Sequence, residues 1–444
     1  MDTLIKKDLK YNWHPFTQMK DCQNLPPILI KRAKGIKLYD NRGKFYYDTI
    51  SSWWCNIHGH GHPRIKTAIK KQLDSLEHVL FAGFTHRGAI ELAQELVRIT
   101  PKNLTKVFYS DNGSTSVESA LKISFQYWQN IGKKKKKKFV SLDAGYHGDT
   151  IGGMSVSGVG TFNQVFKPLF FDSIKVSSPY CYRCPMKKER ISCNIDCIKP
   201  LEKALKRNHR EIAGMILEPL IMAAGGMIVY PKEYLEKVGA LCKKYNIHLI
   251  LDEVATGFGR TGKMFACQHT KVKPDFICLS KGITSGYLPF AATLTTEKIY
   301  KAFYADHNKN KTFFHGHTYT ANPLGCAAAL ASLKIFKEEK TLQKVNRLMP
   351  YFYKELERFR DLPHVGDLRY LGMVGAIELV ENKRTKKRFD PKQRIGLKIY
   401  RESLEQSLIL RSLGDIIYLY LPLRVKKSEL RLILNRTFSM IKKL

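Results

Sequence analysis

The chain has 444 residues, of which 44% are hydrophobic. A chain of this length and hydrophobic content can form more than one compact core, so we expect two or three subdomains. Its 75 basic and 39 acidic residues give a formal net charge of +36, which is typical of nucleic-acid-binding proteins. The basic residues are spread along the whole chain, however, and no nucleic-acid recognition module is visible. The densest run, Lys133–Lys138, falls between a helix-like and an apolar segment, where a surface loop is expected.

What the sequence lacks argues against a membrane protein and against a secreted protein. No stretch of about 20 apolar residues is present, so we expect no membrane span. The first residues, MDTLIKKDLKYNW, contain no apolar signal core. The ten cysteines are unevenly placed in a long chain, which favours reduced thiols and a cytoplasmic location.

The pattern along the chain predicts βα units and a mostly parallel sheet. Amphipathic helices are expected over 62–78 and 89–99, and a further helix from Asn322 toward Glu338. The predicted strands of the large sheet are 106–110, 138–142, 213–218, 247–253, 275–280 and 289–294.

The pattern of predicted elements changes near residue 345. Short strands at 374–379 and 416–421 alternate with helices at 394–406 and 427–444, which indicates a smaller α+β unit. We expect an N-terminal segment (1–65) that packs with this unit and with the pocket. A large domain (66–340) and a C-terminal small domain (341–444) follow.

Two apolar runs end in charged residues. IHLILDE ends in Asp252 and Glu253, and DFICLSK ends in Lys281. Ligands gather at the carboxyl ends of parallel strands. A partly desolvated lysine has a depressed pKa and can form a Schiff base, while an aspartate can pair with a protonated ring nitrogen. Alone, each residue could be a helix cap or a surface group; together they favour pyridoxal phosphate.

A phosphate needs a helix N-terminus or a nest of backbone N–H groups. In SDNGSTSVESALK the chain turns at Gly113, and Ser114 opens a helix, although an ordinary helix cap would look similar. Tyr146, in a glycine-rich loop, could stack on a flat cofactor ring. Thr318 precedes a helix of small residues, and its hydroxyl could bind phosphate or serve a plain turn.

The dipeptide Trp53–Trp54 holds two of the four tryptophans. Adjacent side chains on a strand point to opposite faces, so one core cannot easily take both. Either one ring is in the core and the other lines a different surface, or the segment is the irregular wall of a pocket.

These pieces, in this order, resemble a class III pyridoxal-phosphate aminotransferase of fold type I. The similarity extends over nearly the whole chain and includes SDNGSTSVESALK, GYHGDTIGGMS, ILEPLIMAAGGM, DEVATGFGRTGKMFA, LSKGITSGYLP and HGHTYTANPLGCAA. The resemblance implies an α/β enzyme with a large, mostly parallel-sheet domain that binds the cofactor and a smaller α+β domain. Within the class, WHPFTQM, SSWW and GYHGDTIG resemble the branch of biotin synthesis that converts 8-amino-7-oxononanoate to 7,8-diaminononanoate.

The resemblance also implies roles for the cofactor-binding residues. Lys281 would be the Schiff-base lysine and proton shuttle, and Asp252 would pair with the pyridine nitrogen. Gly113 and Ser114 would hold the phosphate, and Tyr146 would stack on the cofactor ring.

Other roles concern the substrate and a second subunit. His317 and Thr318 would reach the phosphate from the partner chain of a homodimer. Trp53 and Trp54 would wall the pocket, where flat apolar surfaces suit a long alkyl chain. Arg411 would bind the substrate carboxylate bidentately, the alternative being a surface arginine at a strand end.

The amino donor is left open by two departures from the family pattern. Phe16 stands where relatives that use S-adenosylmethionine have a tyrosine, and HGHTYT resembles the branch that takes its amino group from lysine. The tryptophan pair favours S-adenosylmethionine. A third alternative is another class III enzyme acting on a diamine or an omega-amino acid. A nucleic-acid-binding protein that kept the scaffold is disfavoured by the intact Asp252 and Lys281.

Two possible metal sites are disfavoured. His58, His60 and His62 alternate in HGHGH, but no carboxylate or cysteine cluster accompanies them. The spacing of Cys181, Cys184, Cys193 and Cys197 suits zinc, but the segment resembles a variable surface loop of the family. We expect no metal at the active site, and we expect His147, Arg260 and Glu253 to support it.

Overall fold

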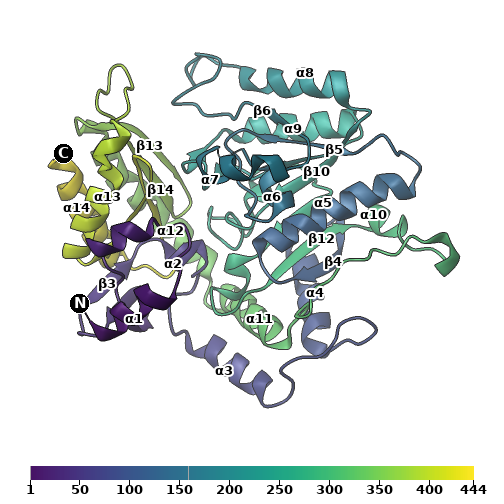
Figure 1. Cartoon of the computed structure of the whole chain (residues 1–444), viewed down its shortest axis with the longest axis horizontal. Coiled ribbons are helices and arrows are strands. Elements are labelled where there is room, and N and C mark those ends of the chain that lie inside the picture. Colours follow the sequence, from purple (N-terminus) through teal and green to yellow (C-terminus); the bar gives the residue numbers. More distant parts are fainter. Residues whose placement is uncertain (1, 159) are drawn as a thin grey trace.

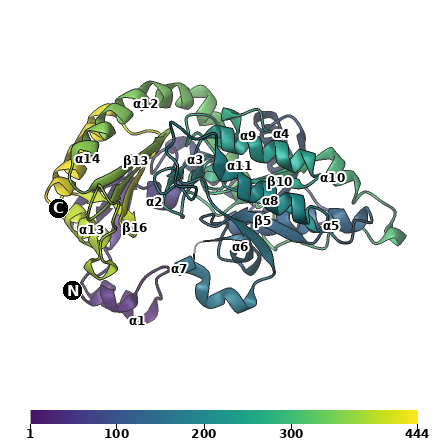
Figure 2. The same ribbon diagram turned by 90° about the horizontal axis from the view of Figure 1, so that it is seen from above.

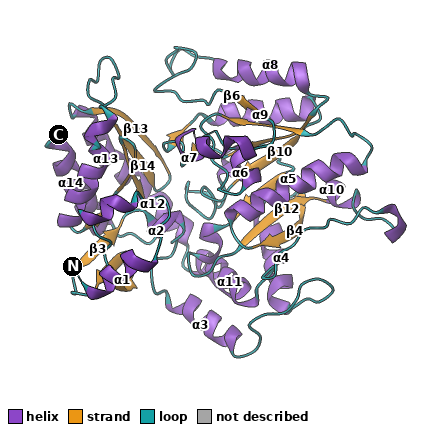
Figure 3. Cartoon of the chain, in the orientation of Figure 1, coloured by secondary structure: helices purple, strands orange, loops and turns teal. Residues whose placement is uncertain are grey.

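The computed structural model describes residues 2–158 and 160–444. Figure 1 shows a large α/β part and a smaller part in which the N-terminal and C-terminal segments lie side by side. In Figure 3 the strands fall accordingly into two groups. Within the described residues, no helix is long and apolar enough to cross a membrane.

The large part is built on a seven-stranded sheet of order β4-β12-β11-β10-β7-β5-β6. All neighbouring strands are parallel except at β12, which runs antiparallel to β4 and β11. The strands are β4 (Leu104–Ser110), β5 (Lys138–Leu142), β6 (Ser173–Val176), β7 (Ile212–Leu217), β10 (His248–Asp252), β11 (Phe276–Leu279) and β12 (Ala291–Thr296).

Helices cover both faces of this sheet, which explains why its strands are continuous apolar runs. Ile250 of β10 packs with the core residues of α5 (Gly113–Asn130), whereas Leu249 and Leu251 pack on the opposite face. That opposite face is covered by α4 (Arg87–Ile99), α8 (Lys199–Asn208), α9 (Lys232–Lys244) and α11 (Pro323–Glu338). Figure 2 shows α5 and α9 on opposite sides of the sheet.

The register of the central strands aligns their carboxyl ends. Leu251 pairs with Leu217 of β7 on one side and with Ile277 of β11 on the other. Glu218, Asp252 and Lys281 therefore follow from neighbouring strands at the same edge of the sheet.

The smaller part contains two four-stranded sheets. One is antiparallel, of order β13-β14-β17-β16, and comprises β13 (Val365–Leu371), β14 (Val374–Leu379), β16 (Arg411–Leu413) and β17 (Ile416–Tyr420). The other joins the two ends of the chain through β1 (Ile30–Lys34), β2 (Lys37–Asp40), β3 (Phe45–Asp48) and β15 (Leu408–Ile409). Because β15 pairs in parallel with β3, the N-terminal segment is part of this region.

The remaining elements connect or cover these sheets. They are α1 (Thr3–Tyr11), α2 (Ser51–Trp54), α3 (Pro63–Leu73), α6 (Ile151–Val156), α7 (Gly160–Asn163), α10 (Glu297–Lys301), α12 (Thr341–Glu357), α13 (Ile395–Glu405), α14 (Lys427–Lys442), β8 (Ile221–Met222) and β9 (Ile228–Val229). The helix expected over 62–78 is shorter than predicted, because the chain leaves the helix after Leu73.

Candidate active site

A cavity of about 1050 Å³ lies at the carboxyl edge of the large sheet. Its lining combines residues from the N-terminal segment, the start of α5, the loops after β5, β10 and β11, and strand β16. Nine of the residues expected from the sequence line it: Phe16, Trp53, Trp54, Gly113, Ser114, Tyr146, Asp252, Lys281 and Arg411.

Lys281 opens a single turn of 3₁₀-helix (Lys281–Thr284) directly after β11. Its Nζ lies 4.7 Å from the centroid of the Trp54 ring. Desolvation lowers the pKa of Lys281, and the nearby Asp252 and Glu218 carboxylates oppose that shift. The pKa is therefore moved in the direction that makes a neutral, nucleophilic amine more available.

Asp252 ends β10 as a buried carboxylate with fixed partners. Its Oδ2 lies 2.8 Å from Nδ1 of His147, which comes from the loop after β5, and its Oδ1 accepts a hydrogen bond from the Val254 N–H at 3.1 Å. The backbone N–H of His147 donates to Ser157 Oγ at 2.7 Å, which fixes the loop that carries this ring. This network holds a carboxylate at the place where a cationic ring nitrogen can pair with it.

Glu218 is a site residue that the sequence reading did not select. It follows β7, it is buried, and its carboxylate accepts hydrogen bonds from the N–H groups of Tyr146 at 3.1 Å and Ala223 at 2.8 Å. Burial, with Asp252 nearby, raises the pKa of Glu218 to about 8. The signal was available, because AGMILE is an apolar run that ends in an acid, like the run before Asp252.

The start of α5 is shaped as an anion site. Asn112 caps the helix by accepting from the Thr115 N–H at 3.1 Å, and the Asn112 N–H donates to Thr115 Oγ1 at 3.0 Å. A Cβ on Gly113 would lie 2.6 Å from Val254 Cγ1, so only glycine fits there. The first N–H groups of a helix have no partner within it, and they favour a phosphate.

Trp53 and Trp54 both line the cavity, but Trp54 also belongs to a buried cluster whereas Trp53 is exposed, so the structure combines both alternatives. The guanidinium of Arg411 lies 5.2 Å from the Trp53 ring centroid, and the Phe16 ring meets Trp53 edge-on at 5.8 Å. Trp54 stacks on Tyr420 at 5.6 Å. The two rings therefore connect the neighbourhood of Arg411 to that of the lysine.

Arg411 begins β16 and is half-buried. Within residues 2–158 and 160–444, no acidic side chain forms an ion pair with it. Its guanidinium lines the cavity, so it can receive a carboxylate from a bound molecule.

His317 and Thr318 do not line this cavity. Nδ1 of His317 lies 3.1 Å from Oδ2 of Asp111, and Thr318 is exposed. A single chain thus leaves these two residues outside the pocket that holds the other predicted site residues.

The three histidines of HGHGH have separate partners. His58 Nε2 lies 3.1 Å from the Ser332 carbonyl, and His62 Nε2 lies 3.1 Å from Glu339 Oε1. His60 contacts Asp48. The fold thus supplies carboxylates that the local sequence did not indicate.

Among the expected supporting residues, His147 lines the cavity, whereas Glu253, Arg260 and the four cysteines lie outside its lining. Cys181, Cys184, Cys193 and Cys197 line a second, smaller cavity, and all ten cysteines are free thiols. In the described part of the chain, no group of three or more His, Cys, Asp or Glu residues could hold a metal ion. Glu253 accepts from the Ala266 and Cys267 N–H groups, and the Arg260 guanidinium lies 4.3 Å from the Tyr420 ring centroid.

The family model for class III aminotransferases matches residues 18–441. The chain belongs to the class III aminotransferases. It is 45% identical over 429 residues to the adenosylmethionine-8-amino-7-oxononanoate aminotransferase of Geobacter sulfurreducens, which covers 96% of this chain and 95% of the relative. The crystal structure of the enzyme of that name from Methanocaldococcus jannaschii superposes with a TM-score of 0.94 at 42% identity, covering 99% of this chain and 98% of that one.

A second similar structure is the omega transaminase of Pseudomonas jessenii in complex with PMP. Its TM-score is 0.94 at 33% identity, and the match covers 100% of this chain and 98% of that one. These comparisons confirm the predicted fold type I architecture and the dependence of this aminotransferase on pyridoxal phosphate. The glycine cradle at Gly113, the buried Asp252 and the desolvated Lys281 fit that cofactor.

Proposed function

We propose that this aminotransferase converts 8-amino-7-oxononanoate to 7,8-diaminononanoate in biotin synthesis, with S-adenosylmethionine as the amino donor. The observation that carries the proposal is the wall of the cavity, where two tryptophan rings connect Lys281 to Arg411. Such a wall suits a keto acid whose carboxylate stands at the end of an alkyl chain. Relatives that bear the corresponding name are 41–48% identical over nearly the full chain.

Lys281 and Asp252 have different roles in the proposed reaction. Bound pyridoxal phosphate supplies the electron sink and the amino-group carrier. Lys281 Nζ takes a proton from the donor carbon and later returns one to the substrate carbon, and its lowered pKa suits both steps. Asp252, held by His147, would pair with the ring nitrogen and favour its protonated form.

The remaining residues would bind and orient. Gly113 and Ser114, at the N-terminus of α5, would hold the phosphate, and Tyr146, whose backbone N–H donates to Glu218, would stack on the cofactor ring. Arg411 binds the substrate carboxylate, which places the keto group near Lys281.

The choice of donor rests on the relatives and on the mouth of the pocket. Phe16 meets Trp53 and Phe162 edge-on, at 5.8 and 5.7 Å between ring centroids. This aromatic corner offers an apolar surface to the methionine part of the donor, without the hydroxyl of a tyrosine. Lysine is the second candidate donor. The similarity to omega transaminases favours testing simple amines as a third.

The assembly and location also belong to this proposal. A homodimer would bring His317 and Thr318 of one chain to the phosphate of the other, since neither lines the pocket of its own chain. Ten free thiols are compatible with the reducing environment of the cytoplasm.

The proposal is tested by product formation. The holoenzyme is incubated with 8-amino-7-oxononanoate and either S-adenosylmethionine or lysine, and the products are analysed by mass spectrometry. We expect 7,8-diaminononanoate with S-adenosylmethionine. Product with lysine alone would reassign the donor, and no product with either donor would contradict the proposed substrate.

A further inference from the structure

The turn that carries Trp53 and Trp54 has a strained backbone. Ser51, Ser52 and Trp54 have positive φ angles of 52°, 60° and 67°. Ser52, with φ 60° and ψ −79°, is close to the γ-turn of positive φ, which is rare in proteins. Residues other than glycine keep such conformations only where their surroundings impose them.

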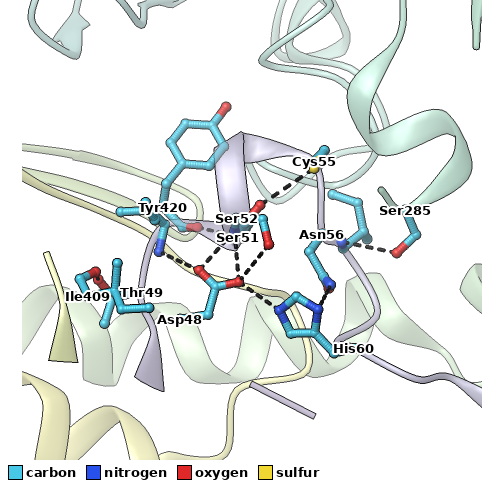
Figure 4. Close-up of polar contacts among 12 residues, drawn as sticks. Asp48, Thr49, Ser51, Ser52, Cys55, Asn56, His60, Ser285, Ile409 and Tyr420 are labelled. Carbon is cyan, nitrogen blue, oxygen red and sulfur yellow. Dashed lines mark hydrogen bonds and ion pairs between the residues drawn. The ribbon is translucent and has the colours of Figure 1, made fainter. Parts of the chain in front are cut away.

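Asp48 is the buried residue whose carboxylate bonds to Ser52, the most strained residue of the turn. It ends β3 and its side chain is fully buried. Figure 4 shows its carboxylate directed at the turn, where the Ser52 N–H donates to Oδ1 at 2.8 Å and to Oδ2 at 2.7 Å. The Ser52 hydroxyl donates to Oδ2 at 3.2 Å and the Ile50 N–H to Oδ1 at 3.3 Å.

His60 completes the coordination of this buried carboxylate. Its Nε2 donates to Asp48 Oδ2 at 2.8 Å, and its Nδ1 accepts from the Asn56 side-chain amide at 3.0 Å, which fixes the tautomer (Figure 4). The backbone of His60 is itself anchored, because its N–H donates to the Gly35 carbonyl at 2.6 Å and its carbonyl accepts from the Gly35 N–H at 3.0 Å. These backbone hydrogen bonds therefore fix the position of the His60 ring that donates to the Asp48 carboxylate.

The turn is also tied to the segment that carries Lys281. Ser285 Oγ, just after the Lys281 turn, accepts from the N–H groups of Ile57 at 3.1 Å and His58 at 2.9 Å. These bonds fix the residues after the turn, so the position of the Trp54 ring, 4.7 Å from the Lys281 amine, depends on the shape of the turn itself.

We propose that Asp48 and His60 are positioning residues that hold both tryptophan rings where the alkyl chain of the substrate lies, and that they thereby determine the preference for a long keto acid. Neither residue lines the cavity, so each acts through the turn. The inference rests on the proposed function for the identity of the long substrate.

Three variants test the inference in the holoenzyme. His60→Leu removes the donor to Asp48, and His60→Gln keeps an amide donor at that place. His62→Gln is the matched control, because this neighbouring histidine also contacts a carboxylate, Glu339, but has no bond to the turn. The measurements are KM and kcat for 8-amino-7-oxononanoate and for the short keto acid pyruvate.

We expect His60→Leu to raise KM for the long substrate about tenfold, with kcat and the pyruvate kinetics within about twofold of the parent. His60→Gln should restore KM to within about threefold of the parent, and His62→Gln should leave it unchanged. An unchanged KM in a folded His60→Leu enzyme would overturn the proposal. An equal rise of KM in His62→Gln would overturn it too.

A second readout does not depend on the substrate. In a Trp13→Phe background, which removes the most exposed of the four tryptophans, acrylamide quenching reports on Trp53, Trp54 and the buried Trp128. We expect stronger quenching in His60→Leu than in His60→Gln or His62→Gln. Equal quenching in all three would contradict the positioning role even if 8-amino-7-oxononanoate were not a substrate.

Discussion

At the scale of single residues, the site depends on charged groups that are held without full solvation. Asp252 has His147 and a backbone N–H as partners, and Lys281 faces the Trp54 ring. Arg411 has the Trp53 ring beside it and no acidic partner among the residues of the described ranges. Each of these groups is therefore available to a ligand atom of opposite charge or to a reacting carbon.

Replacing Arg411 by glutamine should weaken the binding only of substrates that carry a carboxylate. A charge-assisted hydrogen bond contributes about 1.5–3 kcal/mol, so KM for 8-amino-7-oxononanoate should rise roughly tenfold to a hundredfold. An amine without a carboxylate should react as with the parent enzyme, and Arg401→Gln, an exposed arginine on α13, should change neither. Equal losses for both kinds of substrate would show that Arg411 has a structural role instead.

Some of these residues can be predicted from sequence and some cannot. Asp252 and Lys281 stand out because each ends an apolar run, and Glu218 gives the same signal. Asp48 and His60 give none, since their contact depends on a turn with positive φ at residues other than glycine. The roles assigned to the site residues stay predictions until the variants are measured.

At the scale of elements, the junction of α5 with the loop after β10 determines the phosphate site. A Gly113→Ala substitution would bring its Cβ within 2.6 Å of Val254 Cγ1, so helix and loop would have to separate. We expect the Kd for pyridoxal phosphate to rise at least about tenfold, because the first N–H groups of the helix would be displaced. Val254→Ala in the same chain should restore binding, measured by equilibrium dialysis. If Val254→Ala does not restore binding, the phosphate site does not depend on the close contact between Gly113 and Val254.

The contact between β10 and α5 should make the fold sensitive to acid. His248 lies between Tyr127 and Trp128, with Ser124 Oγ 2.9 Å from its Nδ1, and burial lowers its pKa from 6.5 to about 3. The folded state therefore keeps this ring neutral, while the unfolded chain binds a proton below about pH 6.5.

It follows that the free energy of unfolding falls as the pH is lowered from about 6.5 toward 3. At pH 5 the loss attributable to His248 should be about 2 kcal/mol. Urea-induced unfolding of the parent and of His248→Gln at pH 7 and pH 5 measures it. If both proteins lose the same stability between the two pH values, the neutral His248 is not the cause.

Local patterns identify the buried elements well, and distant pairings poorly. The strand expected over 247–253 is β10 (His248–Asp252), and the helix expected from Asn322 is α11 (Pro323–Glu338). The pairing of β15 with β3 joins Leu408 to Tyr47, and no local periodicity reveals contacts over such a separation. β6 (Ser173–Val176) was missed because this edge strand has only four residues and lacks the continuous apolar run of the central strands.

At the scale of the whole molecule, the position of His317 and Thr318 outside the cavity favours a site shared between two chains. Mixed dimers test this arrangement. A Lys281→Ala chain and a Thr318→Glu chain should each be inactive as homodimers, the second because the added carboxylate repels the phosphate. If Thr318 acts in the partner's site, each mixed dimer regains one intact site, and random mixing should restore about a quarter of parental activity. No restoration would show that Thr318 acts within its own chain, and an active Thr318→Glu homodimer would show that Thr318 has no role at the phosphate.

The central claim is that Lys281 and Asp252 form the reactive centre of an aminotransferase that accepts its amino group from S-adenosylmethionine. The most direct measurement is the first half-reaction, followed by absorbance after S-adenosylmethionine is added to the holoenzyme without a keto acid. We predict that the absorption of the pyridoxal form is lost as the pyridoxamine form appears, and that Lys281→Ala shows no such conversion. Conversion with lysine but not with S-adenosylmethionine, or an equal rate in Lys281→Ala, would contradict the account.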